Sequence, residues 1–268
     1  MIQNFKNLNK FKKSLIENGY YVGNRYDNGE FILIKKIINK FDIFIDCGFH
    51  IGDISKDVRK ISNKIKILGF DFNKNFSLAS NKTFLKKNIN FINFGLSDKN
   101  QILRVYNYKN RPELSSLKKR YDYNPKLLKT EFSQTKKMIK LDNYKKEFKQ
   151  TDNIFLKIDT DGSEEKILKG AEKILENYNV SGYFEYGTGF KNFQSTLKKV
   201  FNFMYNKNYR IYRLTKSGLI NYRYYSPIDE NFFQSHYFFT KDNLKKFKMK
   251  RKKIISLTSD KLEDFYLF

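Results

Sequence analysis

Residues Phe41 to Gly52 read F-D-I-F-I-D-C-G-F-H-I-G, and they predict the centre of the fold. Apolar, β-prone side chains fill the first part, which ends at Asp46, and Gly48 and Gly52 follow within six residues. Beyond them, apolar residues at positions 54, 58 and 61 have the spacing of one face of a helix. The stretch therefore predicts a strand, a glycine loop and a helix in that order.

A junction of this kind is a common place for a nucleotide-like ligand. The glycines let the backbone approach a ligand closely, and the helix N-terminus offers unpaired N–H groups. A carboxylate at the strand end, here Asp46, can hold a ribose or ammonium group. The spacing is Gly-x-x-x-Gly rather than the Gly-x-Gly-x-x-Gly of dinucleotide folds, so the loop alone does not identify the ligand.

Acidic residues recur directly after predicted strands. Three further strands, over 65–70, 154–158 and 180–184, are followed by Asp71, Asp159 and Glu185. The alternation of strands with helical segments predicts an α/β fold with a doubly wound parallel sheet, in which such acids share one edge.

The later part of the chain breaks this alternation. Runs 209–214 and 232–239 are joined by the turn-rich segment 216–229 and suit an antiparallel pair at a sheet edge. Residues 109–137 lose periodicity and become polar and basic, which predicts a long loop and a candidate lid over the site.

The sequence predicts one domain with an additional segment at each end. Residues 1–40 carry two helical patterns, the second over 29–38, and form an N-terminal helical decoration. Residues 41–240 form the α/β domain, and residues 241–268 form a strongly basic C-terminal tail.

The 268-residue chain has a formal net charge of +25, from 53 Lys and Arg against 28 Asp and Glu. Such a charge attracts polyanions, so nucleic acid, an anionic glycan and peripheral contact with an anionic membrane are candidate interactions. Compositional bias is the competing explanation, because the abundant Lys, Asn, Ile, Phe and Tyr all have A/T-rich codons. Lys also greatly outnumbers Arg, the residue that bidentate phosphate recognition prefers.

Cysteine usage and hydropathy predict a cytoplasmic location. Cys47 is the only cysteine, so no intrachain disulfide can form and nothing asks for an oxidising compartment. The sequence has no apolar run near eighteen residues and no signal-peptide pattern after Met1.

Ordered blocks between residues 41 and 240 point to a family. They are Phe44 to Gly52, Gly69 to Asn73, Leu96-Ser97-Asp98, Leu114-Ser115-Ser116-Leu117, Leu141-Asp142-Asn143-Tyr144, Leu156 to Glu164 with Leu168 to Ala171, and Phe184-Glu185-Tyr186. Together they resemble the FkbM-type S-adenosylmethionine-dependent methyltransferases. The resemblance implies a class I methyltransferase fold, with a Rossmann-like, mostly parallel sheet of seven strands, and S-adenosylmethionine as the cofactor.

The resemblance also implies site residues. The implied cofactor-binding residues are Asp46, Gly48, Phe49, His50, Gly52, Asp71, Phe72, Ser97, Asp98 and Asp159, and the implied substrate-binding residues are Ser115, Ser116 and Glu185. The chain departs from the family in having Phe49-His50 where Ala-Asn is usual, and Asp for Glu at positions 71 and 161. Phe49 and His50 therefore predict larger side chains near the methionine end of the cofactor. The Asp side chains at positions 71 and 161 are one methylene shorter than the usual Glu.

Methyl transfer requires an acceptor atom aligned about 3 Å from the methyl group, and a positioned base helps when the acceptor is a hydroxyl. Asp159 is the first candidate for that base, followed by Asp161 and His50. Either aspartate could instead hydrogen-bond the start of the following helix, and His50 could simply fill space beside the cofactor. Glu185 could bind the acceptor hydroxyl, a cation or a backbone N–H. Carboxylates also suit hard cations, but no ligand spacing specifies a metal site.

Three functions remain open from the sequence. The leading one is O-methylation of a hydroxyl on a sugar, glycan or other small molecule. A nucleic-acid methyltransferase using the basic surface is the alternative, although the chain has no Asn-Pro-Pro-Tyr-like block for flipped bases. The third is a catalytically inactive scaffold that binds polyanions, which cofactor binding would distinguish from the first two.

Overall fold

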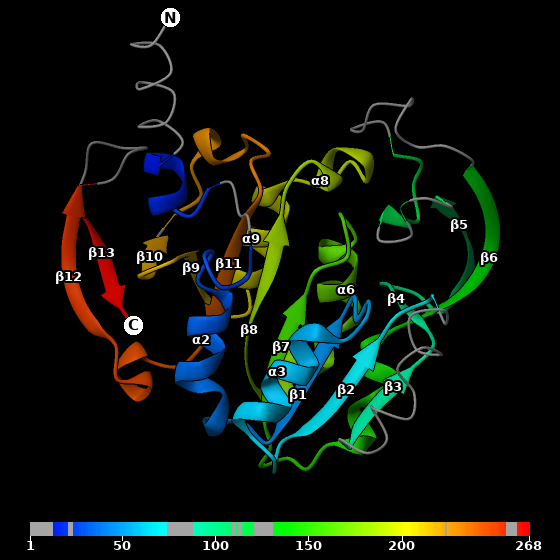
Figure 1. The fold of residues 1–268 in the computed structure, drawn as a ribbon, viewed down its shortest axis with the longest axis horizontal. Coiled ribbons are helices and arrows are strands. Elements are labelled where there is room, and N and C mark those ends of the chain that lie inside the picture. The colour runs from blue at the N-terminus through cyan, green and yellow to red at the C-terminus, as the bar shows by residue number, and fades with distance from the viewer. Residues whose placement is uncertain are drawn as a thin grey trace, which may run out of the picture.

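The computed structural model describes residues 13–20, 24–73, 88–108, 111, 114–120, 131–222, 224–255 and 262–268. Within these ranges the strands form a large and a small sheet (Figure 1). The large sheet consists, in spatial order, of β12 (Lys250–Ile255), β13 (Leu262–Leu267), β10 (Gly218–Tyr222), β9 (Arg210–Thr215), β11 (Ser235–Thr240), β8 (Asn179–Tyr186), β7 (Asn153–Ile158), β1 (Ile43–Cys47), β2 (Lys66–Phe70) and β3 (Ile89–Ile92). The small sheet consists of β4 (Gly95–Leu96), β6 (Glu131–Ile139) and β5 (Gln101–Tyr108).

The half of the large sheet from β8 to β3 is parallel, as the sequence predicts. In its centre β1 pairs with β7 on one side and with β2 on the other, so that Ile43 lies opposite Ile154 and Lys66. Every residue of β1 is buried, as expected for a strand covered on both faces. The carboxyl ends of β1, β2 and β7 therefore meet at one edge of the sheet.

The other half of the sheet is antiparallel and corrects the expected architecture. β11 runs antiparallel to both β8 and β9, which confirms the predicted pairing of 209–214 with 232–239. That pair is not at the sheet edge, however, because β10, β13 and β12 continue the sheet beyond β9. Among the described residues the sheet has ten strands rather than seven, and it is mixed rather than mostly parallel.

The strand β12, with the sequence K-R-K-K-I-I, shows little alternation of polarity and gives no clear strand signal in the sequence. β12, which lies where the sequence predicts a basic tail, is rich in Lys and Arg and pairs with β13, which carries Glu263 and Asp264. The Arg251 guanidinium contacts the Asp264 carboxylate at 2.8 Å. Cross-strand pairs of opposite charge stabilise such strands although their sequence shows little alternation of polarity.

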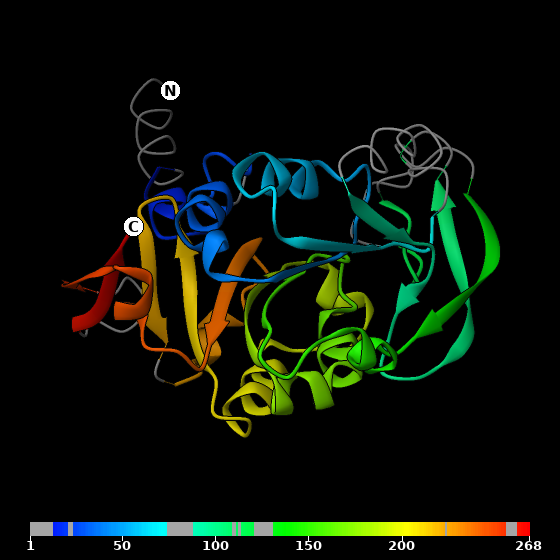
Figure 2. The same cartoon turned by 90° about the horizontal axis from the view of Figure 1, so that it is seen from below.

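Helices cover both faces of the large sheet (Figure 2). α2 (Glu30–Ile37) and α3 (Asp53–Ile61) pack on one face, and α2 confirms the helix predicted over 29–38. α6 (Glu164–Gly170), α7 (Glu172–Asn177) and α9 (Leu197–Tyr205) pack on the other face. The short helices are α8 (Gly189–Asn192), η1 (Ile38–Lys40), η3 (Leu141–Glu147), η4 (Pro227–Asp229) and η5 (Leu244–Phe247). None of the described helices is long and apolar enough to cross a membrane.

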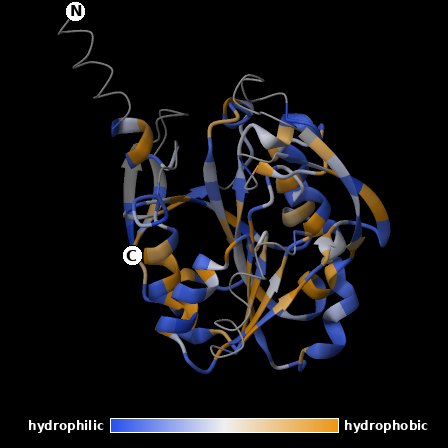
Figure 3. Cartoon of the chain, turned by 45° about the vertical axis from the view of Figure 1, so that its right-hand side comes forward, coloured by the Kyte–Doolittle hydropathy of each residue, from blue (hydrophilic) through white to orange (hydrophobic). Residues whose placement is uncertain are grey.

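Alternate residues of the parallel strands feed the two apolar layers. Phe44 and Phe155 pack toward α2 and α3, whereas Ile45 and Leu156 pack toward the helices of the opposite face. Figure 3 shows apolar residues concentrated along the strands and on the helix sides that face them.

The small sheet lies at the β3 end of the large one (Figure 1). Its strand β6 pairs with β5 from Glu131 to Met138, so the second part of the predicted loop over 109–137 is a strand. Of the first part the structure describes residue 111 and residues 114–120, in which Ser116 forms a bridge with Tyr106 of β5. The rest of the predicted lid lies outside the described residues.

Candidate functional site

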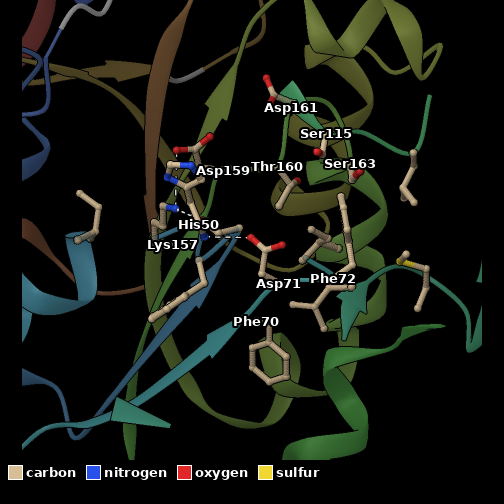
Figure 4. A pocket seen from close by; sticks show the side chains of 18 of the residues that line it. His50, Phe70, Asp71, Phe72, Ser115, Lys157, Asp159, Thr160, Asp161 and Ser163 are labelled. Atoms are coloured by element: carbon tan, nitrogen blue, oxygen red, sulfur yellow. Dashed lines mark hydrogen bonds and ion pairs between the residues drawn. The ribbon is translucent and has the colours of Figure 1, made fainter. Parts of the chain in front are cut away.

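A cavity of about 320 Å³, here called the main pocket, opens at the carboxyl edge of β1, β2 and β7 (Figure 4). It is the crevice in which open α/β sheets bind their ligands. The predicted site residues that line it are Gly48, Phe49, His50, Asp71, Phe72, Ser115, Asp159 and Asp161. Those outside its lining are Asp46, Gly52, Ser97, Asp98, Ser116 and Glu185.

Gly48 lets the ends of β1 and β7 approach closely. Its φ angle is 81°, and a Cβ at this position would lie 1.8 Å from the carbonyl oxygen of Asp159. The Asp159 N–H donates to the carbonyl of Cys47, and the Gly48 N–H donates to the carbonyl of Phe70. Glycine is therefore required here by the joining of three strand ends, and this joining forms the floor of the pocket.

Asp71 is fixed at the end of β2 by two backbone donors. The His50 N–H donates to Oδ2 at 2.9 Å, and the Asn73 N–H donates to Oδ1 at 2.8 Å. Burial raises the pKa of Asp71, and the two N–H groups oppose that rise. A carboxylate offers about four acceptor positions, so both oxygens can still accept a hydrogen bond from a ligand in the pocket.

Asp46, a predicted cofactor-binding residue, lies beneath the main pocket and is not part of its lining. Its side chain is 1% exposed, accepts a hydrogen bond from Ser55 at 2.7 Å and lies 2.9 Å from the Lys157 ammonium. Because both carboxylate oxygens are engaged inside the protein and the residue is absent from the pocket lining, Asp46 is a structural residue of the site floor.

Lys157 links the buried Asp46 carboxylate to the pocket. Lys157 is not among the site residues predicted from the sequence. Its ammonium donates to the Gly48 carbonyl at 2.9 Å and lies 3.7 Å from the Asp159 carboxylate. The sequence held one signal, since a lysine within an otherwise apolar strand must find buried partners.

Phe49 does not place its full bulk in the pocket. The side chain is 2% exposed, and its ring occupies the space beside Gly69, where a Cβ would come within 2.1 Å of the ring. It also contacts the Phe91 ring at 5.3 Å between centroids. The missing side chain at position 69 thus accommodates the larger residue at position 49.

His50 and Asp159 lie next to each other above the pocket floor (Figure 4). His50 adopts a left-handed backbone conformation, with φ of 50°, in the turn that follows Phe49. The Asp159 side chain is 39% exposed. Burial alone would raise the pKa of Asp159, but Lys157 above all, together with Glu185, His236 and His50, holds it below its usual value.

Glu185 adjoins Asp159 although it does not line the pocket. Burial and the charges of Asp159 and Asp161 raise the pKa of Glu185 well above its usual value, and Gln234 donates a hydrogen bond to its carboxyl group. The surroundings therefore shift the pKa values of these two neighbouring carboxyl groups in opposite directions, down for Asp159 and up for Glu185.

Asp161 and Ser115 mark the mouth of the pocket. The Asp161 carboxylate lies 2.9 Å from the Arg120 guanidinium, so it joins the loop before α6 to the segment 114–120. Ser115 faces the pocket (Figure 4), whereas the neighbouring Ser116 is buried and pairs with Tyr106. Only the first serine of the Ser-Ser pair is therefore placed to meet a ligand in this pocket.

Three other predicted cofactor residues lie away from the main pocket. Gly52 begins α3 in a left-handed conformation with φ of 72°. Ser97 is fully buried and donates to Asp98 at 3.0 Å, and Asp98 lines a separate cavity beside α6. Of the block Leu96-Ser97-Asp98, Leu96 alone lines the main pocket.

Arg25 is a pocket residue that nothing in the sequence indicated. It lies before α2, lines the main pocket, and contacts Asp57 at 3.0 Å and Asp53 at 3.6 Å. Among the described residues, no group of three or more His, Cys, Asp or Glu side chains is placed to hold a metal ion.

The strand order and the position of the pocket define an α/β fold with a ligand crevice at the carboxyl ends of its parallel strands. The model of the methyltransferase FkbM domain matches residues 46–211, about three fifths of the chain. The chain therefore belongs to the FkbM methyltransferase family, which implies S-adenosylmethionine as the methyl donor.

Several crystal structures resemble the chain at low identity. The methyltransferase FkbM from Methylobacillus flagellatus is 13% identical with a TM-score of 0.39, and the match covers 74% of this chain and 43% of that one. An rRNA methylase from Streptococcus thermophilus is 12% identical with a TM-score of 0.40, over 79% and 95% of the two chains. A SAM-dependent O-methyltransferase from Thermotoga maritima is 12% identical with a TM-score of 0.41, over 80% and 65%. No curated protein matches the chain.

Proposed function

We propose that this protein transfers the methyl group of S-adenosylmethionine to a hydroxyl oxygen of a sugar, glycan or other small molecule. The observation that carries the proposal is the Asp159 carboxylate, which lies at the end of β7, is partly exposed to the main pocket and is held ionised by Lys157. A hydroxyl needs such an acceptor for its proton, whereas a neutral amine does not.

The charge of the pocket suits the methyl donor. Four carboxylates line it, those of Asp53, Asp71, Asp159 and Asp161, against the two cations Arg25 and Lys157. S-adenosylmethionine supplies a methyl group bound to a positively charged sulfonium sulfur. An excess of carboxylates favours binding of such a cation, and the free acceptor positions of Asp71 suit the ribose hydroxyls.

The residues of the site then have distinct tasks in the transfer. Asp159 accepts the hydrogen bond of the acceptor hydroxyl, which orients its oxygen for in-line attack, and takes the proton as the oxygen–carbon bond forms. Lys157 holds Asp159 in place and, through the Gly48 carbonyl, fixes the loop beside it. His50, next to Asp159, provides a second position for the proton.

Transfer of a labelled methyl group to a panel of sugars, sugar phosphates and glycans tests this function. The expected product is a methyl ether, which survives mild base. A methyl ester, an N-methyl product, or label found only in added RNA or DNA would contradict the proposal. Heat-denatured enzyme is the blank, and Glu147→Ala is the matched active control because Glu147 is exposed and lies outside the main pocket.

A further inference from the structure

A second cavity of about 470 Å³, here called the basic groove, adjoins the main pocket. It lies between β5, the segment 114–120, α6 and α8. Its cationic residues are Arg104, Lys118, Lys119 and Lys166, and its aromatic residues are Tyr106 and Phe193.

The charge of the groove exceeds what composition explains. About one residue in five of the chain is Lys or Arg and about one in ten is Asp or Glu, so the nine lining residues would by composition include about two cations and one acid. The groove has four cations and no acid in its described lining. The described lining of the groove therefore carries cations without acids, whereas acids outnumber cations in the main pocket.

Three features place the groove beside the main pocket. Leu117 lines both cavities. The Phe193 ring packs on Gly162, where a Cβ would come within 2.6 Å of it, directly after Asp161 at the pocket mouth. Arg120 and Asp161 fix the segment 114–120 against that same turn. A molecule seated in the groove can therefore extend toward Asp159.

The volume of the main pocket supports a separate place for part of the acceptor. At about 320 Å³ it is at the lower end of the range of ligand cavities, roughly 300 to 1,000 Å³. Because the methyl donor fills such a volume, only the reacting end of an acceptor fits beside it. The remainder of the acceptor needs the adjoining space, and the chemistry of that space indicates what the remainder carries.

We propose that the basic groove binds a phosphate or diphosphate group of the methyl acceptor, so that the acceptor is a phosphorylated sugar or a related phosphate ester. This inference rests on the proposed function. Lysine ammonium groups are established phosphate ligands, and the Arg104 guanidinium can add paired hydrogen bonds to phosphate oxygens. Three of the four cations in the groove are lysines, whereas recognition of nucleic-acid bases favours arginine, so the lining suits a small phosphate group better than a nucleic-acid strand.

Calorimetric titration with inorganic pyrophosphate tests the groove directly. The groove variant combines Arg104→Gln, Lys118→Gln and Lys166→Gln, and the control variant combines Lys35→Gln, Lys40→Gln and Lys198→Gln, which lower the net charge equally at exposed positions elsewhere. We expect pyrophosphate binding to weaken at least tenfold in the groove variant and less than twofold in the control. Absence of binding to the wild type, or equal weakening in both variants, would overturn the proposal.

Two parallel titrations separate the possible causes. S-adenosylhomocysteine should bind the wild type, the groove variant and the control variant equally. If it does not bind the wild type, the proposed function is wrong, and the pyrophosphate titration still tests whether the groove binds phosphate. Tighter binding of UDP than of pyrophosphate, or recruitment to vesicles containing a polyprenyl phosphate, would identify a nucleotide-linked or lipid-linked acceptor. Single-stranded RNA is the last probe. If it binds more tightly than pyrophosphate, if its affinity falls steeply with salt, and if the groove variant no longer binds it, the acceptor would be a nucleic acid and the proposal would be overturned.

Discussion

The main pocket and the basic groove lie side by side and have opposite charge. Carboxylates outnumber cations in the main pocket, whereas the described lining of the groove contains cations and no acid. The net charge of +25 is therefore not spread evenly around the site. The difference indicates a division of labour in which the main pocket takes a cationic methyl donor and the groove takes an anionic part of the acceptor.

The largest effect is expected from Asp159→Asn, which removes the proposed proton acceptor of the main pocket. The amide keeps the shape of the carboxylate but cannot take a proton, so kcat should fall by about 10² to 10⁴ while S-adenosylhomocysteine affinity stays unchanged. Steady-state kinetics with an acceptor found in the panel, together with calorimetry, would measure both. Asp161→Asn is the control, and an equal loss of kcat in both variants would contradict the role of Asp159.

The next effect is expected from Asp71→Ala on binding of the methyl donor. Hydrogen bonds to a charged group contribute about 1.5 to 3 kcal/mol each, so S-adenosylhomocysteine affinity should fall about ten- to a hundredfold. Asp98→Ala should leave the affinity unchanged, because Asp98 lines a different cavity. If Asp98→Ala weakened binding as much as Asp71→Ala, the cofactor would extend further toward α6 than the main pocket does.

A smaller difference is expected in how salt changes the affinity of each cavity for its ligand. Raising the ionic strength from about 50 to about 300 mM screens exposed charges strongly and partly buried ones much less. We expect pyrophosphate affinity for the groove to fall severalfold and S-adenosylhomocysteine affinity to change less than twofold. Equal salt dependence for both ligands would mean that the charge difference between the cavities does not govern binding.

The smallest effect concerns Glu164, which lies between the two regions at the start of α6. It accepts hydrogen bonds from the backbone N–H and the hydroxyl of Thr160, and burial raises its pKa to about 8. The folded chain keeps a proton that the unfolded chain releases near pH 4.5, so this stability is present below about pH 4.5 and is lost as the pH rises through about 8.

Glu164→Gln keeps the acceptor oxygen and removes the titration. We expect its melting temperature to match that of the wild type near pH 5 and to exceed it near pH 9, with about 2 to 4 °C for each kcal/mol recovered. Scanning calorimetry across this range measures the difference. A constant difference at all pH values would show that Glu164 is ionised in the folded protein.

The parallel half of the fold was predictable from the sequence because its signals are local. Buried strands such as β1 and β7 are short apolar runs ending in an acid, and the acids Asp71 and Asp159 reach the same pocket as expected. The strand β12 was not predictable, since it is mostly Lys and Arg and forms its ladder with β13, a segment further along the chain. Charge pairing between distant segments leaves no periodic pattern.

The sequence predicted the acidic residues of the candidate site but not the basic residues that contact them. The resemblance implies that Asp46 and Asp98 bind the cofactor, and this stays a prediction; in the structure Lys157 contacts Asp46 inside the protein and Asp98 lines another cavity. Arg25 comes from a segment before the family-matched region, so no motif could have included it. The roles of individual site residues depend on which neighbours a side chain meets, and the fold decides this.

Calorimetric titration of the purified protein with S-adenosylhomocysteine in moderate salt tests the central claim most directly, because it needs no knowledge of the acceptor. The main pocket, with the Phe49 ring withdrawn beside Gly69, should bind one equivalent with a micromolar Kd, about −8 kcal/mol. No detectable binding would contradict the account and would leave the polyanion-binding scaffold as the remaining function.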